Sequence, residues 1–227
     1  MIYLNVQQDL FQKQETQYKE FMQKSIPNEP NLIGVRMGYL KQTANRLIKN
    51  GLWQEYISHQ AFYHEEKIIQ ALIMASQIKS KQEMTLFESF VPHITNWAIC
   101  DCFCTYIKIN PEEKEIFFKV IQKYLKSDKE FEVRVALVML LMHYINSNYL
   151  DRIFKILDEF SHQGYYAQMA AAWLLSLCYV KHKDKTKDYL LRSKLDNDTF
   201  NKGIQKMIES NLVSKDEYPF LKALKRR

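Results

Sequence analysis

Glycine and proline, the residues that most often interrupt regular backbone, are scarce in this chain of 227 residues, with five of each. Together they make up about 4% of the sequence, against a usual share of roughly 12%. Phosphate-cradling loops, dinucleotide-binding turns and multi-hairpin β folds depend on glycine at tight turns and positive-φ positions. The sequence contains neither G-x-G-x-x-G nor G-x-x-x-x-G-K-[ST]. We therefore expect neither a β-rich fold nor a nucleotide-binding α/β enzyme.

The overall composition is that of a globular protein with a basic balance. Lys and Arg outnumber Asp and Glu by 32 to 26, and a net charge of +6 favours a polyanionic partner. No stretch reaches the ~18 continuous apolar residues that predict a membrane span, and the start MIYLNVQQDL does not resemble a signal peptide. Three of the four cysteines, Cys100, Cys102 and Cys104, crowd one segment, which indicates reduced thiols rather than a disulfide framework. We expect a cytoplasmic protein without a membrane association.

Apolar residues recur at spacings of three and four, which is typical of helices, rather than at the spacing of two found in strands. Short segments with helix-breaking residues divide the chain, and they are Pro27–Asn31, Asn50-Gly51, Pro92, Asn110-Pro111 and Gly164. The sequence therefore predicts an all-α fold.

Two kinds of helical segment alternate along the chain. Residues 111–126 and 151–160 are amphipathic and rich in charge, whereas residues 91–107, 133–145 and 165–180 are almost uncharged. Alternation of covering and buried helices is typical of stacked helix pairs. Shifts of about 35 residues bring successive apolar segments into register, a period that matches helical repeats. We expect an α-α superhelix, or solenoid, of about five or six HEAT-like helix pairs in a single domain over residues 1–227, with residues 1–30 leading into the repeats.

The few polar residues of the uncharged segments form a candidate site. Asp101 lies four residues after Trp97, so the two side chains share a helix face, while Arg134 and Trp173 occupy the next two uncharged segments. Because equivalent helices lie side by side in a stack, these four side chains could converge on one concave surface. Indole faces and a carboxylate attract a cationic group, and a guanidinium binds phosphate. The alternative from the same residues is structural: an Asp101–Arg134 ion pair and two core tryptophans.

Other candidate sites are weaker. On a helix, Cys100 and Cys104 point one way and Cys102 the other, so these cysteines cannot converge with His93 and His143 on one zinc ion. A catalytic pair of a cysteine nucleophile with His143 as its base has no further support in the sequence. The His64-Glu65-Glu66 run lacks the H-E-x-x-H spacing. We therefore expect no metal and no cofactor. Lys202, Lys206 and the tail LKALKRR are solvated charges or, alternatively, phosphate contacts.

Several strings resemble the DNA alkylation repair family, whose glycosylases are built from HEAT-like repeats. In chain order they are IGVRMGYLKQTANRL, FVPHITNWAICDCF, KSDKEFEVRVALVMLLMHYI, YYAQMAAAWLLSLCYVK and TFNKGIQKMIES, which together cover about Ile33 to Ser210. The resemblance implies a C-shaped solenoid with a basic concave face for duplex DNA, and excision of cationic purines such as N3-methyladenine and N7-methylguanine without metal or cofactor. It also implies that Asp101 is the catalytic carboxylate, that Trp97 and Trp173 line the lesion, and that Arg134 lies near the DNA backbone.

The chain departs from this family near its start. Gly38 stands where the family often has proline, and Arg36 stands where a characterised branch has glutamine. Arg36, Lys202 and Lys206 join Arg134 as expected DNA-binding residues. The leading hypothesis is an alkylpurine DNA glycosylase that acts as a monomer. The alternatives are a DNA-binding solenoid without excision activity and a protein-binding scaffold.

Overall fold

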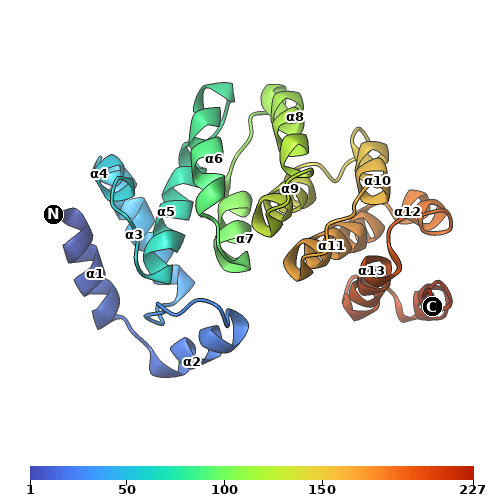
Figure 1. Cartoon of the computed structure of the whole chain (residues 1–227), viewed down its shortest axis with the longest axis horizontal. Coiled ribbons are helices and arrows are strands. Elements are labelled where there is room, and N and C mark those ends of the chain that lie inside the picture. Colours follow the sequence, from blue (N-terminus) through green and yellow to red (C-terminus); the bar gives the residue numbers. More distant parts are fainter. The chain divides into compact units, whose positions relative to one another are not determined.

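The computed structural model describes all 227 residues, and they form helices joined by short connections, without a strand (Figure 1). This confirms the predicted all-α class and its arrangement in successive helix pairs. No helix is both long enough and apolar enough to cross a membrane. The α-helices are α1 (Ile2–Gln12), α2 (Thr16–Ser25), α3 (Met37–Lys49), α4 (Trp53–Ile57), α5 (His64–Gln77), α6 (Met84–Phe90), α7 (Trp97–Tyr106), α8 (Lys114–Tyr124), α9 (Glu130–His143), α10 (Leu150–Asp158), α11 (Tyr165–Lys181), α12 (Lys183–Leu190), α13 (Asn197–Glu209) and α14 (Tyr218–Ala223).

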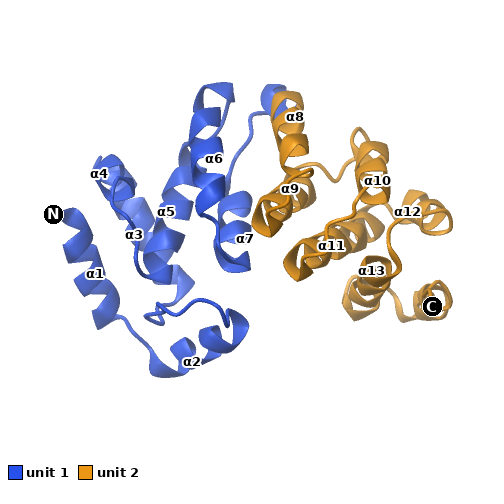
Figure 2. Ribbon diagram, viewed as in Figure 1, with its two compact units in different colours: residues 1–114 blue, residues 115–227 orange.

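The chain divides into two compact units, residues 1–114 and residues 115–227 (Figure 2). In unit 1, α5 packs against α3 on one side and α7 on the other, while α4 and α6 also contact α5. Helix α5 is the centre of this unit, and most of its residues are buried, including Ile69, Ile73 and the polar run His64–Glu66. Unit 1 is therefore a row of three inner helices with shorter helices beside them.

Unit 2 repeats this arrangement with α11 packed between α9 and α13. Small residues allow the close approach of α11 and α13: a Cβ atom on Gly203 would lie 2.9 Å from Leu175 Cδ2. Helix α10 buries one apolar stripe, and its Phe154 ring stacks on Tyr189 of α12 with centroids 4.2 Å apart. The amphipathic segment 151–160 and the uncharged segment 165–180 thus form the covering helix α10 and the inner helix α11, as predicted.

The uncharged segment 91–107 is not one helix, which corrects the predicted boundaries. Residues Val91–His93 form a short 3₁₀ turn, and the α-helix begins only at Trp97. The backbone of Asn96 is extended, and its side-chain oxygen accepts the hydrogen bond of the Ile99 N–H at 3.1 Å. Asparagine is a favoured N-cap residue because its side chain satisfies a backbone N–H that has no partner inside the helix. The start of α7 is therefore set by Asn96.

Within unit 2, the Glu217 carboxylate holds the C-terminal segment against α11 and α12, and its contacts make the stability of the folded state depend on pH. Burial alone would raise the pKa of Glu217, but the Tyr179 hydroxyl at 2.7 Å and the ammonium groups of Lys183 and Lys187 lower this pKa to about 2. A depressed carboxyl pKa stabilises the folded state at pH values above the unfolded pKa, and this contribution is lost as the pH falls towards 2.

We therefore expect Glu217→Gln to be less stable than the wild type at pH 7, with a difference that shrinks as the pH falls from about 4.5 to about 2. Urea unfolding of both proteins at pH 7 and pH 3 measures this. A stability difference that stays the same at the two pH values would contradict the assigned role of the Glu217 charge.

Candidate functional site

Helix α7 carries one partly exposed stripe, and that stripe contains two of the predicted site residues. Trp97 and Asp101 are partly exposed and Thr105 is exposed, at successive intervals of four residues. The residues between them are buried, namely Ala98, Ile99, Cys100, Cys102, Phe103 and Cys104. The shared helix face predicted for Trp97 and Asp101 is therefore the face of α7 that solvent reaches.

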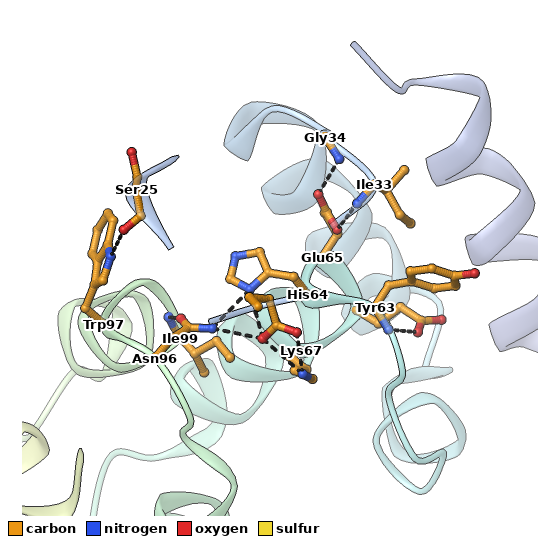
Figure 3. A network of polar contacts seen from close by, with 12 residues as sticks. Ser25, Ile33, Gly34, Tyr63, His64, Glu65, Lys67, Asn96, Trp97 and Ile99 are labelled. Atoms are coloured by element: carbon orange, nitrogen blue, oxygen red, sulfur yellow. Dashed lines mark hydrogen bonds and ion pairs between the residues drawn. The ribbon is translucent and has the colours of Figure 1, made fainter. Parts of the chain in front are cut away.

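The indole of Trp97 is oriented by a hydrogen bond to a distant part of the chain. Its Nε1–H donates to the carbonyl oxygen of Ser25 at 2.9 Å, and Ser25 is the last residue of α2 (Figure 3). Because this bond uses the only polar hydrogen of the indole, the part of Trp97 that remains for a ligand is its ring face. A ring face attracts positive charge through its quadrupole.

The other two members of the predicted set, Arg134 and Trp173, lie in unit 2. Arg134 is only 6% exposed, and its Nη1 donates to the carbonyl oxygen of Tyr166 at 2.8 Å, which links α9 to α11. Trp173 is half-buried and lies on the partly exposed stripe of α11 with Tyr166 and Met169. Trp97 and Asp101 belong to unit 1, so the convergence of all four side chains stays a prediction.

Arg36 is exposed and pairs with an acidic residue of the N-terminal segment. Its guanidinium lies 2.9 Å from the Glu15 carboxylate and 4.8 Å from the centroid of the Tyr18 ring. The hydrogen bond from Arg36 lowers the pKa of Glu15, although both groups are largely solvated. An exposed ion pair of this kind contributes little to stability, so the guanidinium can exchange Glu15 for a phosphate at small cost.

The predicted basic residues of α13 differ in how firmly the protein holds them. The Lys202 ammonium donates to the side-chain oxygen of the buried Gln168 at 3.0 Å, which ties α13 to α11. Lys206, one turn later, is half-buried. In the tail, Arg226 donates to the carbonyl oxygens of Leu195 and Ser193 at 2.6 and 2.7 Å, so this arginine packs on the protein rather than standing free in solvent.

The cysteines lie in the core and form no disulfide. Burial raises the pKa of the Cys102 thiol to about 12, with the nearby Asp101 carboxylate acting in the same direction, and it raises the pKa of the Cys178 thiol to about 12 as well. Since the thiolate is the reactive form, these two side chains stay unreactive thiols at neutral pH. No group of three or more His, Cys, Asp or Glu side chains is arranged to hold a metal ion.

Sequence reasoning missed a buried polar network at the start of α7. Glu29 is 7% exposed and contacts Lys67 and Asn96, while Asn96 also contacts His64 (Figure 3). The N-cap role of Asn96 could have been predicted from the sequence, because an asparagine directly before an apolar helical run is a common N-cap. The role of Glu29 could not have been predicted from the sequence, because Glu29 lies in a proline-containing connection and its partners are 38 and 67 residues away.

Comparison with known proteins assigns the chain to a family. The family described as DNA alkylation repair enzyme matches residues 6–207, from within the first helix into α13. No curated protein matches the chain significantly. The family match spans most of both units and includes α7, α9, α11 and α13. The chain therefore belongs to the DNA alkylation repair enzyme family.

Proposed function

We propose that this protein is a DNA glycosylase that binds duplex DNA and excises cationic alkylated purines, such as N3-methyladenine and N7-methylguanine, by hydrolysis of the N-glycosidic bond. The observation that carries the proposal is the shared, partly exposed face of Trp97 and Asp101 on α7, in a chain that belongs to a DNA alkylation repair family. Duplex DNA is the proposed partner, and the reaction needs neither a metal nor a cofactor.

The residue types suit this chemistry. An alkylated purine carries a positive charge and is already a good leaving group, so its departure needs little help from a general acid. The deoxyribose that remains develops oxocarbenium character, which a nearby carboxylate stabilises while it orients the attacking water. In the proposed complex, Asp101 supplies this carboxylate. The ring faces of Trp97 and Trp173 stabilise the cationic base and sugar by cation–π attraction.

The charge distribution supports a polyanionic ligand. Unit 2 contains 20 Lys and Arg against 14 Asp and Glu, whereas unit 1 contains 12 of each, so the whole excess of +6 lies in unit 2. We propose that Lys202 and Lys206 contact DNA phosphates there, with Arg36 as a contact from unit 1. Arg134 is deeply buried, so we propose that it acts at the DNA backbone indirectly, through the Tyr166 region that it holds.

The proposal is tested with duplex DNA that has been treated with a methylating agent. The released bases are separated and identified, and abasic sites are counted in the same sample. We expect time-dependent release of N3-methyladenine or N7-methylguanine with an equal number of abasic sites. We also expect DNA affinity to fall steeply with salt, because binding displaces counterions from phosphates.

The two alternatives give different results in this experiment. Salt-sensitive binding without release of a base would identify a DNA-binding solenoid that lacks excision activity. No binding to DNA at near-physiological salt would identify a protein-binding scaffold instead. Either result would contradict the proposed reaction.

A further inference from the structure

The start of α7 is held at two adjacent points by one segment of the chain, Ser25–Glu29. The Ser25 carbonyl oxygen accepts the indole N–H of Trp97 at 2.9 Å. The Glu29 carboxylate accepts the side-chain N–H of Asn96 at 3.1 Å, while the Asn96 oxygen caps Ile99 at 3.1 Å. Asn96 and Trp97 are consecutive, so these bonds fix both where α7 begins and how its first turn is rotated (Figure 3).

Glu29 is a buried carboxylate, and its other contacts keep it charged. Its two oxygens lie 3.0 and 3.1 Å from the Lys67 ammonium. Burial alone would raise the pKa of Glu29, but His64 and Lys67 hold it below the ordinary value. The Lys67 ammonium and the Asn96 N–H share Glu29 Oε2, so Lys67 also fixes the oxygen that reaches α7.

Such a network contributes more to geometry than to stability. Buried ion pairs are seldom more stabilising than apolar residues of the same volume, because desolvation of the charges offsets their attraction. Hydrogen bonds are directional, however, and apolar packing is not. A bond to Asn96 beside a bond to Trp97 therefore restricts rotation of α7 about its own axis.

We propose that Glu29 is a positioning residue for base excision, which acts through Asn96 and in concert with the Ser25–Trp97 bond to aim Trp97 and Asp101. This inference rests on the glycosylase function proposed above. A rotation of about 10° about the axis moves a side-chain tip about 5 Å from that axis by about 1 Å. A misplacement of about 1 Å at a reacting centre costs up to about 10²-fold in rate.

The geometry allows a test in which the hydrogen bond is broken and then restored with its polarity reversed. Glu29→Gln keeps one acceptor oxygen but sets an amide N–H₂ group among the donors of Asn96 and Lys67, so the bond to Asn96 is weakened. Asn96→Asp keeps the cap on Ile99 but sets a second carboxylate opposite Glu29. The double variant Glu29→Gln/Asn96→Asp restores one donor and one acceptor and leaves the net charge of the pair unchanged.

Single-turnover excision with enzyme in excess over methylated DNA is the main measurement. We expect each single substitution to lower the excision rate constant by about tenfold, and the double variant to recover to within about threefold of the wild type. DNA affinity stays within about twofold in all three variants, since no phosphate contact is removed. A loss confined to the rate constant separates positioning from weakened binding.

A second variant covers the case in which these substitutions prevent folding. Asn96→Ser keeps a good N-cap for Ile99 and removes the side-chain contacts to Glu29 and His64. We expect it to fold and to lose the same factor in excision rate. The matched control is Ile73→Val, which trims a buried core residue of α5 that takes no part in these hydrogen bonds, so it lowers the melting temperature and leaves the excision rate within about twofold.

The NMR signal of the Trp97 indole N–H tests whether Glu29 positions the start of α7, without any measurement of activity. The chain has three tryptophans, and the indole N–H resonance of Trp97 is identified by its absence from Trp97→Phe. We expect faster hydrogen exchange of this indole in Glu29→Gln and Asn96→Ser and wild-type protection in the double variant.

The possible results are distinguishable. If the wild type releases no base, the proposed function fails, and the exchange of the Trp97 indole still shows whether Glu29 positions α7. If the wild type is active, and Glu29→Gln and Asn96→Ser excise at the wild-type rate, the positioning role is overturned. An equal loss of rate in Ile73→Val would also overturn it, because that result would indicate general destabilisation.

Discussion

Asp101→Asn is expected to lower the proposed alkylpurine excision rate by about 10²- to 10³-fold, the range observed when one preorganised electrostatic contact is removed from an active site. The substitution keeps the size of the side chain and its place on the partly exposed stripe of α7. It removes the charge that would stabilise the oxocarbenium-like sugar. We expect the same change to leave the affinity for duplex DNA unchanged or slightly higher, because a carboxylate near phosphates opposes binding.

The measurement compares single-turnover excision of N3-methyladenine by the wild type and the variant, with DNA affinity measured in parallel. Glu88→Gln is a matched control, since it removes an exposed carboxylate from α6 of the same unit and is expected to leave both quantities unchanged. Equal excision by Asp101→Asn and the wild type would contradict the catalytic assignment of Asp101, even if the protein proves to be a glycosylase.

The fold was largely predictable because its signals are local. A helix that is apolar all round, such as α11, and one with a single apolar stripe, such as α10, differ in the sequence itself, and their alternation predicts stacked pairs. Boundaries were harder. The uncharged segment from Val91 continues through the 3₁₀ turn and across Asn96, so the absence of charge alone did not show that α7 starts at Trp97.

The site was predictable only in part, for a physical reason. The shared face of Trp97 and Asp101 follows from their spacing, because four residues are about one helical turn. The burial of Arg134 depends on α11, whose Tyr166 carbonyl accepts its hydrogen bond from 32 residues away. The role of Glu29 likewise depends on two other parts of the chain. Interactions of this kind arise from packing and leave no periodic trace in the sequence.

Glu65→Gln is expected to destabilise unit 1 by about 4 kcal/mol, because the charge that strengthens these buried hydrogen bonds is lost and at least one buried N–H loses its acceptor. Glu65 is 2% exposed, and its carboxylate accepts the backbone N–H groups of Ile33, Gly34 and Val35 at 3.0, 2.7 and 3.2 Å. These three residues lie outside any helix or strand, so the carboxylate supplies the acceptors that regular secondary structure would otherwise provide.

The backbone at this point cannot easily rearrange to find other partners. Gly34 has a φ of +97°, and a Cβ atom there would lie 2.6 Å from Lys19 Cβ, so α2 and the segment approach closely. In Glu65→Gln the new amide retains one acceptor oxygen but turns a donor group towards backbone donors. At least one buried N–H then loses its partner, at a cost of about 1–3 kcal/mol in addition to the lost charge.

Urea unfolding followed by circular dichroism measures this effect, with Glu20→Gln as the control. Glu20 is an exposed carboxylate on α2, and its substitution is expected to change stability by less than about 0.5 kcal/mol. An unfolding midpoint for Glu65→Gln equal to that of the wild type would contradict the role of this carboxylate.

Because Val35 directly precedes Arg36 and α3, loosening of Ile33–Val35 also frees the Arg36 side chain. Weaker DNA binding by Glu65→Gln under conditions where it remains folded would therefore connect this buried carboxylate to the proposed phosphate contact of Arg36.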